Sequence, residues 1–158
     1  MNIKFYFDLE ETLINSFYSP IFCNQNKIER FIKDNKIKEI GIFSAAICNI
    51  KDKEHFILYI KEGIEKRYGI KIIDSRVITM QQVVDMYMSN LCISLDISEL
   101  LSLYGKNGAF HQYCNMLYRS NHTCILLDDA FDDITIHNYK TNLITKIINI
   151  VELKILNL

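Results

Sequence analysis

Residues 5–14 read FYFDLEETLI, an apolar run that turns into a group of carboxylates. The apolar residues 3–7 predict a short strand that ends at these acids. Asp8, Glu10 and Glu11 would repel one another in so small a space, so a fold that keeps them together needs positive charge beside them. An acidic strand end taken alone is typical of a turn or a helix N-cap, so its meaning depends on the rest of the chain.

Two further strands are predicted to end in polar side chains. The sequence TCILLDD at residues 123–129 is the clearest buried strand of the chain, and it ends at Asp128 and Asp129. A shorter apolar run, EIGIFSAA at residues 39–46, reaches Ser44 near its end. Parallel sheets bind ligands beyond the carboxyl ends of their strands, so these three strand ends are expected to converge on one site.

The segments around these strands alternate between helix and strand patterns. The spacing of apolar residues predicts helices over 24–36, 51–68, 81–90, 96–104, 108–119 and 141–153, with further strands within 70–80 and 134–138. Gly69 and Gly105 are expected to end two of these helices. The alternation predicts an α/β fold: a Rossmann-like three-layer sandwich with a mainly parallel central sheet, formed by residues 1–158 as a single domain.

Composition indicates a globular protein without a dominant charge. The chain has 158 residues, of which 49% are hydrophobic and 23% charged, and its net charge is -1. This balance does not indicate a strongly basic nucleic-acid surface. Nucleic acid stays open as a partner through a local basic patch of Lys51, Lys53, Lys61, Lys66 and Arg67, residues that otherwise belong to a solvated helix face.

Several features favour a cytoplasmic location. The first apolar run reaches Asp8 too early for a signal peptide, and no apolar window is long enough for a membrane span. The five cysteines include no CxxC pair, which favours reduced thiols over a disulfide framework or a zinc site. Cys114 and Cys124 lie in apolar stretches and are expected in the core.

The oxygen ligands at the predicted strand ends suit a hard cation such as Mg²⁺. Asp8 and Asp128 would supply two carboxylates from neighbouring strands, and the cation would keep Asp8 ionised at neutral pH. An ionised and fixed carboxylate can act as a nucleophile that forms an aspartyl-phosphate. Glu10, two residues further on, is expected on the same side and can exchange a proton.

Phosphate binding would also need hydrogen-bond donors. Ser44 offers a hydroxyl at a strand end, although a plain turn serine fits the same position. Lys106 offers a positive charge between two glycines in YGKNGAF, and Lys71 and Lys140 compete for the same role. Phosphoryl transfer depends mostly on positioning and charge stabilisation, so this set of groups is chemically sufficient.

These segments, in this order, resemble the motifs of the haloacid dehalogenase-like (HAD) phosphatase superfamily. That family has a strand ending in DxDx(T/V), a strand ending in Ser or Thr, a Lys ahead of a helix, and a strand ending in an acidic pair. The corresponding segments here are FYFDLEETLI, IGIFS, GKNGAF and CILLDDAFDD, and the resemblance spans residues 3 to about 138. The resemblance implies a HAD-like fold and a phosphatase activity.

The resemblance also implies a role for each acid. Asp8 would be the nucleophile and a Mg²⁺ ligand, and Glu10 would be the general acid and base and would ligate the metal through its carbonyl. Asp128 would be the second carboxylate on the metal, and Asp129 would assist it. Asp132 and Asp133, in the same motif, are reserves.

The phosphate side of the site follows from the same resemblance. Thr12 would orient the turn beside the phosphate, Ser44 would bind it, and Lys106 would hold the nucleophile and the phosphate together. Residues 14–22 leave room only for a short flap, and residues 45–106 are taken up by predicted helices and a strand, so no large cap domain is expected. An uncapped site favours a bulky substrate: a nucleic-acid 3'-phosphate, a nucleotide or a phosphoprotein.

Glu10 departs from the family pattern, because most members carry Asp at that position. The extra methylene displaces the acid by about one bond length, and catalysis is sensitive to such shifts. The enolase-phosphatase branch also carries Glu there, and DLEETLINS looks like the DLDETLVHS form of the carboxy-terminal-domain phosphatases. The alternative hypothesis is a catalytically weakened scaffold that acts as a binding or regulatory protein.

Overall fold

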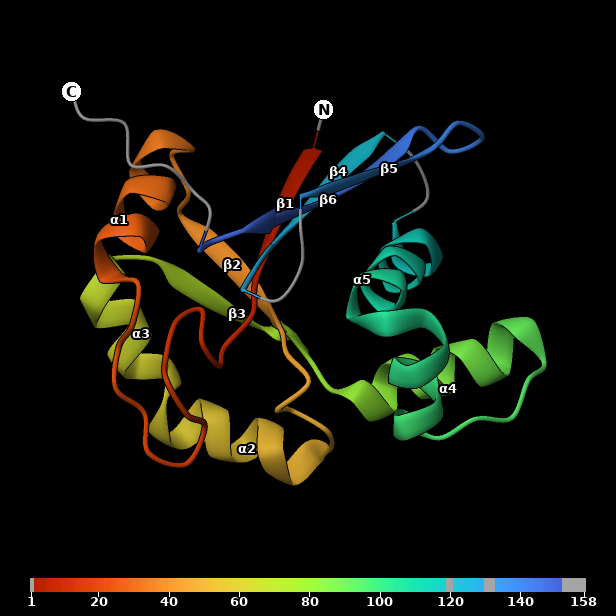
Figure 1. Cartoon of the computed structure of the whole chain (residues 1–158), viewed down its shortest axis with the longest axis horizontal. Helices are drawn as coiled ribbons and strands as arrows, with labels where there is room; N and C mark the ends of the chain where they lie inside the picture. The colour runs from red at the N-terminus through yellow and green to blue at the C-terminus, as the bar shows by residue number, and fades with distance from the viewer. Residues whose placement is uncertain (1, 119–120, 130–132, 152–158) are drawn as a thin grey trace.

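The computed structural model describes residues 2–118, 121–129 and 133–151. Its centre is a six-stranded sheet in the order β3-β2-β1-β4-β6-β5 (Figure 1). All neighbouring strands are parallel except β5, which pairs with β6 in antiparallel fashion. The strands are β1 (Asn2–Phe7), β2 (Glu39–Phe43), β3 (Lys71–Ile78), β4 (His122–Asp128), β5 (Ile134–Asn138) and β6 (Leu143–Asn149). The predicted α/β class with a mainly parallel, Rossmann-like sheet is confirmed.

Helices cover both faces of the sheet and make three layers (Figure 1). One face carries α1 (Gln25–Asp34), α2 (Ile50–Tyr59) and α3 (Lys61–Tyr68), and the other carries α4 (Met80–Leu91) and α5 (Ile97–Leu117). The alternation of β1 divides its side chains between the two layers, because Phe5 and Phe7 enter the first core and Tyr6 enters the second. Both faces are therefore buried, as expected for parallel strands.

The connections place a topological switch point between β1 and β4. The chain runs from β1 to β2 and β3 on one side and then returns to place β4 on the other side of β1. β1 and β4 pair in parallel from Asn2 with His122 to Phe7 with Leu127. The carboxyl ends of β1, β2 and β4 therefore share one edge of the sheet, which is where a doubly wound sheet binds ligands.

The helix predicted over 141–153 is wrong, because residues 143–149 form β6 between β4 and β5. Leu143, Thr145, Ile147 and Asn149 are buried and alternate with more exposed neighbours, which is the period of a strand. Four of the seven residues in LITKIIN are β-branched, which also favours a strand. Residues 152–153 of that prediction lie outside the described residues.

The predicted helix over 51–68 is divided into α2 and α3 at Ile60, where the backbone angles are φ -118 and ψ -43. Phe56, Ile60 and Ile64 all enter the same core, so the division keeps both halves packed on the sheet. Gly69 ends α3 in the left-handed conformation, as predicted. Gly105 interrupts α5 with φ 68 and ψ 171, as predicted, but the helix resumes at Lys106 and not at residue 108.

Residues 45–106 are all described, and they form α2, α3, β3, α4 and the first part of α5. Because these elements cover the sheet, that stretch contains no additional cap domain. Residues 14–22 form a short flap, closed by a bridge between Ile14 and Phe22. No helix among the described residues is long and apolar enough to cross a membrane.

Gly41 allows β2 to lie close to Tyr6 and to the bulged part of β3. A Cβ atom at Gly41 would lie 2.6 Å from ring carbons of Tyr6 and 2.7 Å from the carbonyl oxygen of Arg76. Gly41→Ala is therefore expected to lower the free energy of unfolding by about 2 kcal/mol or more in urea denaturation. Gly63→Ala is the control, because its nearest neighbour would lie 3.7 Å away and the change should raise stability by about 0.5 kcal/mol in a helix. Equal stability of the two variants would contradict this close approach.

Candidate functional site

Asp8 lies directly after β1, where a tight turn holds its side chain. Its backbone N–H donates to the carbonyl of Leu127 on β4 at 2.9 Å, which continues the parallel ladder. The carbonyl of Leu9 then accepts from Thr12 N–H at 3.1 Å and Leu13 N–H at 2.8 Å, so the chain reverses at once. The Thr12 hydroxyl is thereby brought to Oδ2 of Asp8, to which it donates at 3.3 Å.

Asp128 and Asp129 lie at the end of the adjacent strand. Asp128 is completely buried, and its Oδ1 accepts from the backbone N–H of Asp129 at 2.7 Å. One carboxylate oxygen from each of Asp8, Asp128 and Asp129 lies within 4.8 Å of the others. The structure therefore brings together three of the four predicted metal-binding acids.

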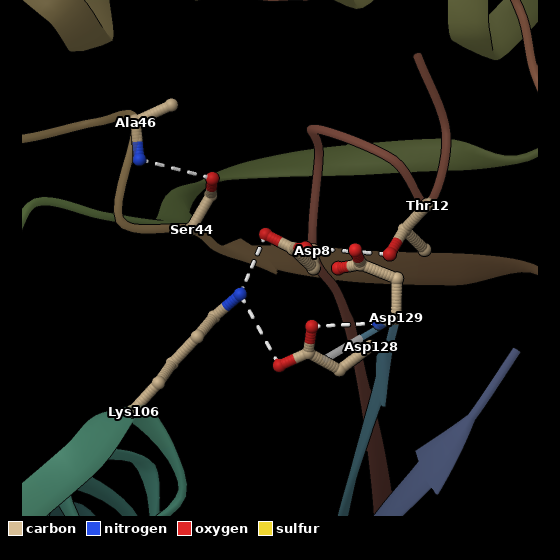
Figure 2. A network of polar contacts seen from close by, with 7 residues as sticks. All are labelled: Asp8, Thr12, Ser44, Ala46, Lys106, Asp128 and Asp129. Carbon is tan, nitrogen blue, oxygen red and sulfur yellow. Dashed lines mark hydrogen bonds and ion pairs between the residues drawn. The ribbon is translucent and has the colours of Figure 1, made fainter. Parts of the chain in front are cut away.

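Lys106 supplies the positive charge of the site (Figure 2). Its Nζ lies 2.7 Å from Oδ1 of Asp8 and 3.2 Å from Oδ2 of Asp128. The break at Gly105 precedes it, so Lys106 begins the second part of α5 and extends from there toward the sheet edge. The two competing lysines lie elsewhere. Lys71 is at the amino end of β3, and Lys140 lies in the turn between β5 and β6.

Burial and charge give the three carboxyls different pKa values. Burial raises the pKa of Asp8 to about 7, despite the attraction of Lys106 and with the added repulsion of Asp128. Burial also raises the pKa of Asp129. Burial opposes ionisation of Asp128 too, but Lys106 and the hydrogen bond from Asp129 outweigh it, so the pKa of Asp128 is lowered. One lysine does not neutralise three carboxylates, and the site is short of positive charge.

These residues fit a hard divalent cation. The three acids offer only oxygen ligands, and such ligands from one or two carboxylates are typical of protein-bound Mg²⁺. A divalent charge beside them would also favour the ionised form of Asp8, whose burial otherwise favours the protonated form. Asp8, Asp128 and Asp129 are therefore the residues that would hold the metal.

Glu10 does not join this cluster among the described residues. Its Oε2 accepts from the backbone N–H of Phe17 at 2.9 Å, so the carboxylate is attached to the flap. Glu11 is exposed and takes the left-handed conformation with φ 62 in the turn between Asp8 and Thr12. The proposed acid and base role of Glu10 stays a prediction, as does its ligation through the carbonyl.

Ser44 lies at the same sheet edge, one residue after β2 (Figure 2). It is buried, and its Oγ accepts from the backbone N–H of Ala46 at 3.2 Å. A hydroxyl that accepts one hydrogen bond still has its own proton to donate. The turn role is therefore seen in the structure, and the phosphate-binding role of Ser44 stays a prediction.

Two further residues complete the account of the predicted acids. Asp133 accepts from the backbone N–H of Asn149 at 2.8 Å and so fixes the segment before β5 to the end of β6. Asp132 lies outside the described residues.

Asn24 is a site-supporting residue that the sequence patterns did not indicate. Its Nδ2 donates to the carbonyls of Glu11 at 2.8 Å and Thr12 at 3.0 Å. Its position just before α1 is the signal that could have indicated a structural role.

No family model matches this chain, and neither a curated protein nor a solved structure matches it. The resemblance to the HAD phosphatases therefore rests on the four motifs, and the positions of their residues rest on the geometry described above.

Removal of the Lys106 charge should expose the repulsion between Asp8 and Asp128. Without metal, Lys106→Met is expected to lower the free energy of unfolding by about 3 kcal/mol, because one partner of a buried ion pair is lost. Added Mg²⁺ should restore most of this loss, and thermal denaturation with and without a chelator measures both changes.

The matched control is Lys61→Met, which removes an exposed ion pair with Asp74 and should cost less than about 1 kcal/mol. An equal loss in the two variants, or no greater response of Lys106→Met to Mg²⁺, would show that Lys106 does not balance the acidic cluster.

Proposed function

We propose that this protein is a Mg²⁺-dependent phosphomonoester hydrolase in which Asp8 is the nucleophile. The observation that carries the proposal is the way in which this carboxylate is held. Lys106 contacts Oδ1 and Thr12 contacts Oδ2, in a buried position at the switch point of a parallel sheet. Fixed geometry, low exposure and neighbouring positive charge are what a carboxylate nucleophile requires.

The first half of the reaction transfers the phosphoryl group to the protein. An oxygen of Asp8 attacks phosphorus, the bond between phosphorus and the alcohol oxygen breaks, and an aspartyl-phosphate forms. Glu10 gives a proton to the departing oxygen, so the product leaves as an alcohol. Lys106 lies beside Asp8, where its charge offsets the negative charge that gathers on the transferred group.

The second half restores the protein. Water attacks the phosphorus of the aspartyl-phosphate, and Glu10, now a carboxylate, accepts a proton from that water. The bond between phosphorus and the Asp8 oxygen breaks, inorganic phosphate leaves and Asp8 is a carboxylate again. This role requires the Glu10 carboxylate to turn from the N–H of Phe17, which it contacts at 2.9 Å, toward the phosphoryl group.

Mg²⁺ held by Asp8, Asp128 and Asp129 would supply charge neutralisation and orientation for the phosphate oxygens. Ser44, at the end of the neighbouring strand, would donate its hydroxyl proton to the same phosphate. The absence of a cap in residues 45–106 supports an open site and hence a bulky or macromolecular substrate.

One observation favours the second candidate function, a binding or regulatory protein with a weakened site. The Glu10 carboxylate is engaged with the flap and lies outside the three-acid cluster. A site of this kind would bind a phosphate group and Mg²⁺ without turnover. Hydrolysis assays and binding assays on the same preparation separate the two candidates.

Replacement of the nucleophile is the direct test of the enzyme. The wild-type protein with Mg²⁺ should hydrolyse a generic aryl phosphate, and Asp8→Asn should lower kcat by about a thousandfold or more. Asp34→Asn is the control, since Asp34 pairs with Arg30 on the surface of α1 and its change should leave kcat unaltered. Chelation of the metal should also stop turnover. Failure of the wild-type protein on a broad panel of phosphates, together with no binding of Mg²⁺, would exclude the proposed reaction.

Glu10→Gln separates proton transfer from support of the flap. The amide oxygen of Gln can still accept from Phe17 N–H, so the flap contact should remain while proton exchange is lost. We expect kcat for an alkyl phosphate to fall by about a hundredfold and kcat for an aryl phosphate, whose leaving group needs no acid, to fall much less. Equal losses on both substrates would assign Glu10 a positioning role instead.

A further inference from the structure

Three rings form a row along the flap and α2, which we call the aromatic row: the exposed Tyr18 on the flap, and the half-buried His55 and the exposed Tyr59 on α2. The ring centroids of Tyr18 and His55 are 5.4 Å apart, and those of His55 and Tyr59 are 5.1 Å apart. The side chains at the two ends of the row are largely in solvent, with Tyr18 76% and Tyr59 73% exposed. A contiguous group of exposed aromatic rings is a common feature of binding sites.

The aromatic row is attached to the catalytic machinery through Phe17. The backbone N–H of Phe17 donates to Glu10 at 2.9 Å, and its buried ring lies against His55 with 5.0 Å between centroids. The ring of Phe17 also contacts Tyr18 at 5.2 Å. Phe17 therefore links the aromatic row to Glu10, the residue proposed to exchange protons at the site.

The charge along α2 adds one cation to this surface. Lys51 is exposed and lies one helical turn before His55, which in turn lies one turn before Tyr59, so the three residues share a helix face. Asp52 is turned into the N-cap, where it accepts from the N–H groups of Cys48 and Asn49 at 2.9 and 3.2 Å. Lys53 and Glu54 lie on the same helix and offset each other, so the charge along α2 is close to balanced and the rings carry most of the recognition.

We propose that the aromatic row stacks the bases of a short single strand of nucleic acid whose terminal phosphate enters the site. Bases present flat aromatic faces, and stacking on Tyr and His side chains tolerates any sequence. A row of several rings gives platforms for more than one base, whereas a free nucleotide would use a single ring. The inference rests on the proposed phosphatase function and names the substrate class of that site.

The selectivity test compares two substrates in each variant. For the wild-type protein, kcat/KM should be higher for a short oligonucleotide with a terminal phosphate, at its 3' or 5' end, than for phosphoserine. Tyr18→Ala and Tyr59→Ala should each lower this ratio by about tenfold, which is the effect expected for one lost base stack. Tyr139→Ala should leave the ratio unaltered. Tyr139 is a matched control, because it is 84% exposed and stacks on His137, but lies in the β5–β6 turn at the opposite edge of the sheet.

A binding measurement separates failure of this inference from failure of the proposed function. A fluorescent oligonucleotide, titrated into the wild-type protein and followed by anisotropy, should bind about tenfold more weakly to Tyr18→Ala and Tyr59→Ala but not to Tyr139→Ala. If this pattern appears while no phosphate is hydrolysed, nucleic-acid binding by the aromatic row is supported and the proposed phosphatase activity is contradicted. If phosphates are hydrolysed and neither ring change alters the ratio or the binding, the phosphatase stands and the row is overturned.

Other occupants of the row give different results. An equal loss of kcat/KM with a mononucleotide phosphate would show that the row binds a single base. It would contradict binding of a nucleic-acid strand. A loss confined to phosphopeptides would assign the row to a protein substrate. Loss of self-association in sedimentation, with oligonucleotide binding unaltered, would make the row a contact between copies of this chain.

Discussion

The contact of Lys106 with Asp8 and Asp128 is the interaction on which the site depends. The two carboxylates come from adjacent strands and are almost completely removed from water, where two like charges need a counter-charge to remain ionised together. Lys106 brings that charge from α5, on a long side chain that directly follows the break at Gly105. It does not balance the third acid, Asp129, and without a metal the raised pKa values of Asp8 and Asp129 favour their protonated forms. Such electrostatic frustration is common where function, rather than stability, selects the residues.

The topology explains why these groups meet although they are far apart in the sequence. The order in which strands join the sheet reverses between β1 and β4, at the point where Asp8 and Asp128 leave their strands. Ser44 lies at the same edge because β2 is parallel to β1. The flap follows directly after the turn that fixes Thr12. The flap carries Tyr18 of the aromatic row, and the other two rings of the row lie on α2.

The sequence predicts the strands best where they are apolar throughout and end in acid, because a buried parallel strand and its polar end give two independent signals. It fails at LITKIIN, where apolar residues fit both a helix and a strand in so short a window, and only pairing with β4 and β5 decides. The division between α2 and α3 at Ile60 could not be predicted, because no Gly or Pro marks it in the sequence. Among the site residues, the choice of Lys106 over Lys71 and Lys140 needed the sheet order. The partner of Glu10 is a backbone N–H of Phe17, and a backbone donor has no signature in the sequence.

The pairing of β1 with β4 also determines when the site can exist during synthesis. Asn2 lies opposite His122, and β4 in turn needs β6 on its far side, so the central strands wait for most of the chain to leave the ribosome. Loop closure over such separations is slow, which delays the sheet relative to its helices. Until then Asp8 remains in water without Lys106 or Asp128, as an ordinary solvated carboxylate. The electrostatic conflict of the finished site therefore arises only once β4 and α5 have joined β1.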